Sequence, residues 1–219
     1  MLINTQHLSP ASARLNTLFR ELFMTDSSPI RILDSQILAN DWGVLTKYTL
    51  DYQRRDGSRQ QHTRETYDRG NGATVLLYNL ERRTIVLIRQ FRLPTYLNGI
   101  PDGMLIETPA GLLDNAAPEE RIRAEIEEET GYHLHHVTKL FEAYMSPGSV
   151  TEKLYFFAAE YDSDTHRSEG GGLADEGEDI EVMEFGFDEL LDMIRAGRIL
   201  DAKTIMLVHY AALYLFPKR

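Results

Sequence analysis

The sequence predicts an α+β protein in which a mixed β-sheet lies between helices as an α-β-α sandwich, preceded by a small antiparallel β-domain. Strand and helix patterns intermix along the chain without regular βαβ repetition, and this order is typical of a mixed sheet flanked by helices. Near the amino terminus, two polar strand patterns flank an Asp56-Gly57 turn, which indicates a β-hairpin. The 219 residues suffice for one full domain and a small accessory one.

Residues 1–29 form a separate arm. Its apolar residues recur at the spacing of an amphipathic helix, namely Leu15, Leu18, Phe19, Leu22 and Phe23. Such a helix would dock on the body or on a partner subunit. Met24, which precedes a polar stretch, is an alternative start that would make the arm dispensable. Both interpretations remain open.

Residues 30–68 are predicted to form the small β-domain, with hairpin strands at 43–53 and 59–68. The glycines at 70 and 72 then interrupt the pattern, and residues 69–219 form the main domain. In order, this domain is expected to contain strands at 73–80 and 83–91, a loop at 92–103, a strand at 104–110, an acidic helix, strands near 136–145 and 152–161, a glycine-containing loop at 163–179, a strand at 180–185, and helices near 188–195 and 202–216.

The acidic helix places glutamates on its apolar side. At about 100° per residue, Ile122 and Ile126 lie about 40° apart and define the buried stripe. Glu129 lies about 20° and Glu125 about 60° to one side of Ile122, and Glu128 follows on the next turn. Because unpaired buried carboxylates repel one another, a hard divalent cation with oxygen ligands would stabilise them. A solvated acidic face supported by nearby arginines is the alternative.

Composition limits the classes of partner and compartment. The net charge of −11 argues against nucleic acid held on a basic surface. No apolar run approaches the roughly 18–20 residues of a membrane span, and no secretory signal is visible. The absence of cysteine excludes disulfides and thiolate metal sites. We therefore expect a cytoplasmic protein without nucleic-acid or membrane partners.

The run GLLDNAAPEERIRAEIEEETGY, residues 111–132, resembles the Nudix box, whose usual form is G-x5-E-x7-REUxEExGU, with U a bulky apolar residue. The matching positions are Gly111, Glu125, Ile126, Glu128, Glu129, Gly131 and Tyr132. The chain departs from the pattern in three ways. The stretch before the RE position is one residue short, Ala124 replaces the box Arg with Arg123 one place earlier, and Ala117 occupies the first Glu position.

The resemblance extends over roughly residues 30–219. RETYDRGNGATVLLYN, VLIRQFR, AGLLDN, YMSPGSVTE, EDIEV and DAKT are similar to the GDP-mannose diphosphatase branch of the Nudix hydrolases, which is close to the ADP-ribose diphosphatases. This resemblance implies a Nudix fold for residues 69–219. It also implies Mg²⁺ as the cofactor, with Mn²⁺ as a substitute.

The resemblance further implies a set of metal ligands and a general base. The main ligands would be Glu125, Glu129 and the backbone carbonyl of Ala110, with Glu128 either assisting or remaining a solvated neighbour. Glu178, on the glycine-containing loop, matches a further metal ligand. Two residues compete for the role of general base, namely Glu176 and Glu152, and Glu152 is also a candidate substrate contact.

By the same resemblance, six residues would bind substrate, namely Trp42, Arg64, Glu65, Arg92, Glu152 and Lys203. Arginine geometry suits phosphate oxygens, and the lone tryptophan would stack on the base. The alternatives are surface strand arginines, an ordinary first-turn lysine, and a tryptophan packed in the core. Similar enzymes exchange contacts across a dimer through the amino-terminal β-segment, so a homodimer is expected in which residues 30–68 help build the partner's site.

The implied reaction is hydrolysis of the pyrophosphate bond of a nucleotide sugar, most closely GDP-mannose to GMP and mannose 1-phosphate. The nearest alternative is an ADP-ribose diphosphatase with the same chemistry and a different base pocket. An alternative of another class is a non-hydrolysing nucleotide-sugar sensor. Such a sensor would be expected to lack the metal carboxylates, and this chain retains them.

Overall fold

The computed structural model describes residues 28–173, 175 and 177–217. The chain divides into two compact units. Of the described residues, the first unit contains 28–69 and Gly148–Val150, and the second contains Gly70–Pro147 and those from Thr151 to 217. The arm predicted at 1–29 lies outside the described residues except for its last two positions.

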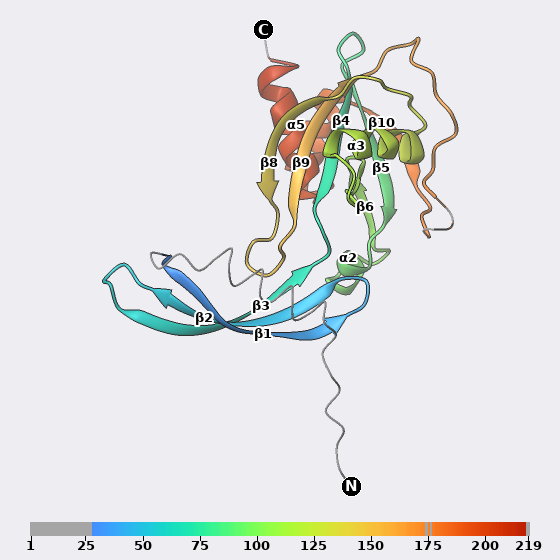
Figure 1. Ribbon diagram of the computed structural model, residues 1–219. Helices are drawn as coiled ribbons and strands as arrows, with labels where there is room; N and C mark the ends of the chain where they lie inside the picture. The colour runs from blue at the N-terminus through green and yellow to red at the C-terminus, as the bar shows by residue number, and fades with distance from the viewer. Residues whose placement is uncertain (1–27, 174, 176, 218–219) are drawn as a thin grey trace. The chain divides into compact units, whose positions relative to one another are not determined.

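The first unit contains a three-stranded antiparallel sheet (Figure 1). Its strands pair in the order β1 (Ile30–Asn40), β2 (Val44–Gln53) and β3 (Arg59–Asp68). The predicted hairpin turn between β2 and β3 is confirmed. The backbone N–H and hydroxyl of Ser58 donate to Asp56 Oδ1 at 2.9 and 2.5 Å, and Gly57 supplies the positive φ of +83° that this tight turn needs.

The second unit contains a seven-stranded mixed sheet. Along its main path the order is β10-β5-β4-β9-β8, while β6 pairs with β5 and β7 pairs with β4. The β4–β9 pair is parallel and the other pairs are antiparallel, which confirms the predicted mixed sheet. The strands are β4 (Gly72–Asn79), β5 (Thr84–Phe91), β6 (Met104–Glu107), β7 (Ala110–Leu112), β8 (Thr138–Tyr144), β9 (Lys153–Glu160) and β10 (Glu181–Gly186).

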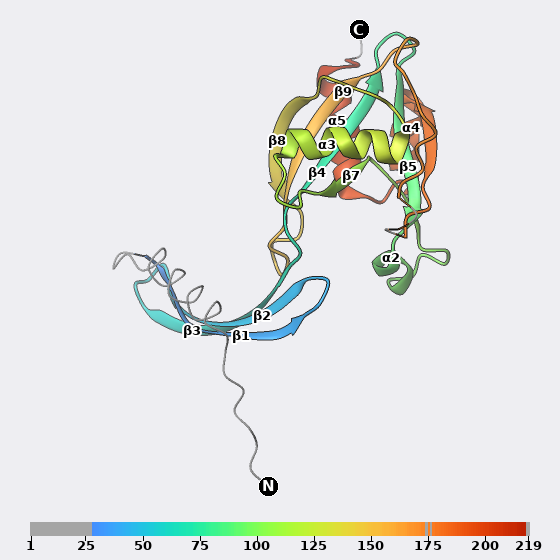
Figure 2. The same cartoon turned by 45° about the vertical axis from the view of Figure 1, so that its right-hand side comes forward.

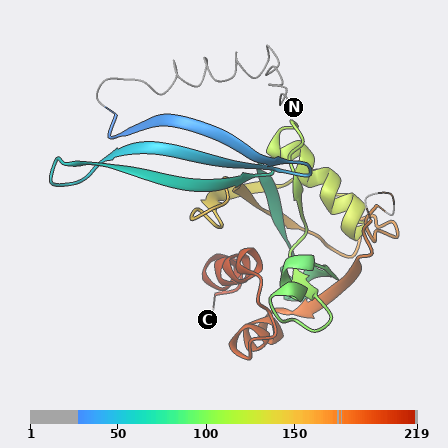
Figure 3. The same ribbon diagram turned by 90° about the horizontal axis from the view of Figure 1, so that it is seen from below.

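Helices cover both faces of this sheet, as the sandwich prediction requires (Figure 2). On one face lies α3 (Pro118–Glu125), which continues into the π-helix η1 (Ile126–Thr130). On the other face lie α4 (Phe187–Arg195) and α5 (Ala202–Tyr214), drawn in red in Figure 3. Alternation along β4 supplies both cores. Ala73, Val75 and Leu77 pack in the cluster of α3, whereas Leu76 packs in the cluster of α4 and α5.

Two segments between β5 and β7 differ from the sequence prediction. The expected loop at 92–103 contains the short helix α2 (Leu93–Leu97), which begins with a proline in its first turn. The expected strand at 104–110 is broken into β6 and β7, because Pro109 has no backbone N–H for a ladder bond. Of the helices in the described part of the chain, none has the length and apolar composition that crossing a membrane requires.

Candidate active site

The break between β6 and β7 carries the chain from β5 across to β4. β4 pairs with β5 only at residues 77–79 and with β7 at residues 72–74, so the two strands separate where the crossing lies. Thr74 Oγ1 donates to the carbonyl of Pro109 at 3.0 Å and lies 2.9 Å from Thr108 Oγ1. The backbone N–H of Val75 donates to the same carbonyl at 3.1 Å. These buried bonds fix the backbone that leads into Ala110.

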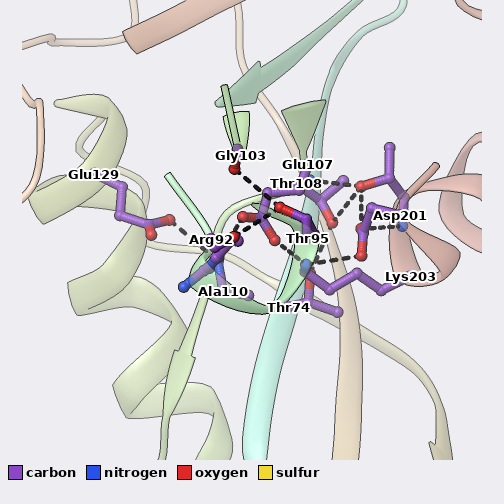
Figure 4. A network of polar contacts seen from close by, with 11 residues as sticks. Thr74, Arg92, Thr95, Gly103, Glu107, Thr108, Ala110, Glu129, Asp201 and Lys203 are labelled. Carbon is purple, nitrogen blue, oxygen red and sulfur yellow. Dashed lines mark hydrogen bonds and ion pairs between the residues drawn. The ribbon is translucent and has the colours of Figure 1, made fainter. Parts of the chain in front are cut away.

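Two carboxylates of the acidic helix are buried against this crossing, as the turn arithmetic predicts. Glu125 is 4% exposed and Glu129 is 1% exposed. The N–H of Ala110 donates to Glu129 Oε2 at 3.1 Å (Figure 4). A Cβ at position 111 would lie 1.6 Å from Glu125 Oε1, so the missing side chain of Gly111 leaves the space that this carboxylate occupies. The glycine that opens the box motif is therefore required by close approach.

The electrostatic environment disfavours charge on both carboxylates. Burial raises the pKa of Glu125 to about 7, with Arg121 acting in the opposite direction and Glu128 and Glu178 adding to the rise. Burial and the nearby carboxylates also raise the pKa of Glu129 well above its usual range. Glu129 forms no ion pair with any residue that the structure describes. Glu129 is thus a buried carboxyl group with one backbone donor and no cationic partner among the described residues.

Arg121 takes the orienting position for which the sequence offers no box arginine. Its Nη2 lies 2.5 Å from Glu125 Oε1 and 3.6 Å from Glu128 Oε2, and its Nε donates to the carbonyl of Leu112 at 3.1 Å. The i, i+4 spacing of Arg121 and Glu125 is the sequence signal that could have identified this contact. The replacement of the box arginine by Ala124 therefore leaves Glu125 with a guanidinium partner from the preceding turn.

The helix widens into a π-turn between the two buried carboxylates, where a regular α-helix was predicted. The hydroxyl of Thr130 donates to the carbonyl of Ile126 at 2.5 Å, so a side chain takes part of the backbone bonding at this end. Gly131 then ends the helix in the left-handed conformation, with φ of 75°. Single π-turns of this kind are frequent at functional sites.

The glycine-containing loop is bonded to the end of the same helix. The backbone N–H groups of Gly171 and Gly172 donate to the carbonyls of Glu129 and Glu128 at 2.9 and 3.0 Å. A Cβ on Gly170 would lie 2.6 to 2.9 Å from the backbone of residues 129–131, so glycine is needed where the two segments meet. The loop therefore lies against the carboxylate-bearing helix.

Glu178 belongs to the same acidic cluster. Its Oε2 accepts from the N–H of Leu173 at 2.9 Å, and its charge contributes to the raised pKa of both Glu125 and Glu129. The structure thus brings together the two acidic segments that the sequence separates by about fifty residues. Glu176, the other candidate on this loop, lies outside the described residues.

Arg92 and Lys203, two predicted substrate contacts, meet on one carboxylate that the sequence reasoning missed (Figure 4). Arg92 Nε donates to Glu107 Oε1 at 2.7 Å, and Lys203 Nζ donates to Glu107 Oε2. Lys203 Nζ also lies 3.2 Å from Asp201 Oδ1. Burial alone would raise the pKa of Glu107, but the two cations lower it, so this carboxylate remains charged.

The start of α5 is tied to the crossing by the same network. Asp201 caps the helix, since its Oδ2 accepts from the N–H and the hydroxyl of Thr204 at 2.9 and 2.6 Å. The hydroxyl oxygen of Thr204 in turn accepts from the N–H of Thr108 at 2.7 Å. Helix α5 therefore presents Lys203 to the segment that also carries Ala110.

The remaining predicted residues are distributed over both units. Glu152, which directly precedes β9 in the second unit, is 7% exposed. Trp42, Arg64 and Glu65 belong to the first unit and are exposed. Trp42 is 68% exposed, so it is not a core residue, and the guanidinium carbon of Arg69 lies 5.6 Å from its ring centroid.

The donor set suits a hard divalent cation. Within residues 28–173, 175 and 177–217, no three acidic or histidine side chains form a closed ligand cluster. Glu125 is instead turned to Arg121, and Glu129 to the N–H of Ala110. The side-chain donors are all carboxylate oxygens, which Mg²⁺ prefers. The carboxylate of Glu125 lies in the space that the missing side chain of Gly111 leaves. The residues present therefore fit an oxygen-liganded divalent metal.

Family models match nearly all of the described chain. The model described as NUDIX domain matches residues 68–207, and the model described as GDP-mannose pyrophosphatase NudK N-terminal domain matches residues 29–67.

Curated relatives cover a similar range. A GDP-mannose pyrophosphatase of Pectobacterium atrosepticum is 55% identical over 185 residues, which cover 84% of this chain and 95% of that protein. A GDP-mannose pyrophosphatase of Yersinia enterocolitica is 55% identical over 188 residues, which cover 86% and 97%. A crystal structure of an ADP compounds hydrolase superposes with a TM-score of 0.65 at 19% identity, over 86% of this chain and 95% of that one. At that identity the solved structure supports the fold alone.

Proposed function

The chain belongs to the Nudix hydrolase family, and from this premise we propose that it hydrolyses the pyrophosphate bond of GDP-mannose to give GMP and mannose 1-phosphate. The observation that carries the proposal is the buried Glu129, which has no ion-pair partner among the described residues and lies near Glu125 and near Arg92, the cation that Glu107 holds together with Lys203. Such an arrangement suits a metal-bound diphosphate, in which the carboxylates bind the metal ion and the cationic side chains bind the phosphate oxygens.

Nudix hydrolases generally use divalent metal ions, and we assign Mg²⁺, with Mn²⁺ as its substitute, to this chain. The proposed ligands are Glu125, Glu129, Glu178 and the carbonyl of Ala110, with Glu128 assisting. A bound divalent cation would neutralise charge on the phosphate oxygens as the phosphorus is attacked. Arg121 would hold Glu125 in place from the preceding turn.

The reaction consumes one water. Its oxygen forms a bond to one phosphorus, the bridging P–O bond breaks, and the bridging oxygen leaves with the other phosphate. A carboxylate accepts the water's proton, for which Glu176 and Glu152 are the candidates. The burial of Glu152 near the start of β9 supports a role within the site.

Base recognition is assigned to the first unit. The exposed indole of Trp42 is available for stacking, while Arg64 and Glu65 lie exposed on β3 for contacts with phosphate, base or ribose. The amino-terminal family match at residues 29–67 supports this assignment. Several large apolar side chains of β1 are exposed, which supports a homodimer in which this unit serves the partner's site: Ile30, Ile32, Leu33, Ile37 and Leu38.

Turnover of a substrate panel with Mg²⁺ tests this function. GDP-mannose, ADP-ribose and a UDP-sugar are compared by ³¹P NMR, with EDTA as the metal-free control. We expect GDP-mannose to give GMP and mannose 1-phosphate with the highest kcat/KM. A preference for ADP-ribose would replace the proposed substrate, and binding without turnover of all three would favour a sensor.

Replacement of Trp42 by alanine is expected to raise KM for GDP-mannose by about tenfold, because base stacking on an aromatic ring contributes about 1–3 kcal/mol. The thermal midpoint should change little, since the indole is 68% exposed. Steady-state kinetics and thermal unfolding of the same preparation check both statements. Tyr52→Ala, which removes another exposed aromatic of the first unit, is the matched control. An unchanged KM in Trp42→Ala would rule out the stacking role.

A further inference from the structure

Glu107 stands apart from the residues that the proposed chemistry uses. It lies at the end of β6, is 1% exposed, and is too deeply placed to meet a charged substrate directly. Both of its oxygens accept from cations, one from Arg92 and the other from Lys203. These partners come from segments on either side of it in the sequence and converge only in the fold.

The geometry at Arg92 leaves its phosphate-binding end available. Nε is the nitrogen bonded to Glu107, at 2.7 Å, and the side chain of Arg92 is 39% exposed whereas that of Glu107 is 2% exposed. The two terminal nitrogens form no bond with the described residues, and a guanidinium held at Nε presents them as a fork. The backbone is also held, since the N–H of Arg92 donates to Gly103 at 2.9 Å and Thr95 Oγ1 donates to its carbonyl at 2.7 Å.

Lys203 is held in a comparable way. Its ammonium donates to Glu107 and forms an ion pair with Asp201, whose Oδ1 lies 3.2 Å from Nζ. Asp201 is fixed by capping α5, and the cap is bonded through Thr204 to Thr108 next to Glu107. The ammonium of Lys203 is therefore held in place by two anchored carboxylates.

The network lies beside the proposed metal ligands. Thr108 precedes Ala110 by two residues, and Ala110 donates its N–H to Glu129 (Figure 4). Burial lowers the pKa of Arg92, but Glu107 and, more weakly, Glu129 raise it above its usual value. Glu129 is therefore close enough to act on Arg92. Glu107 therefore orients its two cations next to the carboxylates of the proposed metal site.

We propose that Glu107 is a positioning residue whose buried carboxylate orients Arg92 and Lys203 as a paired clamp for the diphosphate. The carboxylate acts through the two cations and touches neither phosphate nor metal. A merely structural role would require only that a charge pair the cations, whereas positioning requires the reach of a glutamate at this place. The inference rests on the proposed function, since it assigns the clamp to the same diphosphate.

Binding of inorganic pyrophosphate in the presence of Ca²⁺, measured by titration calorimetry, tests the clamp. The probe has neither base nor sugar, so the result is independent of which nucleotide sugar the enzyme prefers. Glu107→Gln removes the charge, and Glu107→Asp keeps the charge but retracts it by one methylene. We expect both folded variants to bind the probe about 10- to 100-fold more weakly than wild type, the size of effect found when a residue that orients metal ligands is changed.

Glu184→Gln is the matched control, because Glu184 also pairs with an arginine, Arg82 at 2.9 Å, on a strand of the same sheet. It should bind the probe as wild type does. If Glu107→Gln fails to fold, Glu107→Asp decides the question, since its buried charge remains paired. Wild-type affinity in the folded Glu107→Asp variant would overturn the proposal, and so would failure of the wild type to bind the probe. A wrong substrate name would appear only in the turnover panel.

Discussion

The Glu129→Gln variant is expected to lose Mg²⁺-dependent turnover of GDP-mannose by about 10³-fold or more. Metal-assisted stabilisation of phosphoryl charge contributes several kcal/mol, and each 1.36 kcal/mol is tenfold in rate. Glu129 is the most buried of the proposed ligands and has no cation partner among the described residues. The amide would keep the acceptor for the N–H of Ala110 while removing the charge that the metal needs.

The same substitution should not destabilise the metal-free protein. A buried carboxylate whose pKa is raised by burial and by neighbouring acids costs free energy when it is charged, so the neutral amide removes that cost. Glu127→Gln is the matched control, since Glu127 is exposed on the same helix and pairs with His133. Steady-state kinetics and chemical unfolding in EDTA check both parts. Wild-type turnover in Glu129→Gln would remove this residue from the metal site.

The Lys203→Met variant is expected to be destabilised by about 3–5 kcal/mol, because removing one partner of a buried ion pair leaves the other charge uncompensated. Lys203 is 8% exposed; without it Asp201 loses its cation and Glu107 keeps only Arg92. Chemical unfolding followed by far-ultraviolet circular dichroism measures the loss of free energy of unfolding. Glu107→Gln in the same chain should recover part of it, since the buried carboxylate that has lost one of its two cations is then neutral.

Lys139→Met provides the comparison for an exposed pair. Lys139 contacts Glu142 at 2.5 Å on β8, but its side chain is 51% exposed. Exposed pairs contribute about 0–1 kcal/mol, so this variant should unfold close to wild type. Equal effects of the two substitutions would show that the buried network is not the source of the destabilisation. Additive effects of Lys203→Met and Glu107→Gln would contradict a direct coupling between them.

The parts of the site that depend on local periodicity could be predicted from the sequence. Helical spacing alone places Glu125 and Glu129 beside the buried Ile122 and Ile126, and the structure buries all four. The hairpin followed from its Asp56-Gly57 turn, and the mixed sheet from the order of its elements. The helix face and the hairpin need only residues that are near one another in the chain, and the sheet type needs only the order of the elements.

The parts that depend on long-range pairing could not be predicted in this way. Glu107 and Lys203 are 96 residues apart, and no periodicity or spacing indicates that Arg92 and Lys203 both bind Glu107. The sequence predicts one continuous strand at 104–110, whereas the chain breaks at Pro109 and turns toward β4. The cap at Asp201 did carry a local signal, because an aspartate precedes the helix and Thr204 lies three residues later. The π-turn was missed because the prediction assumed a regular α-helix.

The most direct test of the metal assignment is an anomalous difference map from crystals grown with Mn²⁺ and GMP. We predict a peak within coordination distance of Glu125, Glu129 and the carbonyl of Ala110, and its loss in Glu129→Gln crystals. A Mn²⁺ peak at another place, or an undiminished peak in the Glu129→Gln crystals, would contradict the assignment of these carboxylates as the metal site.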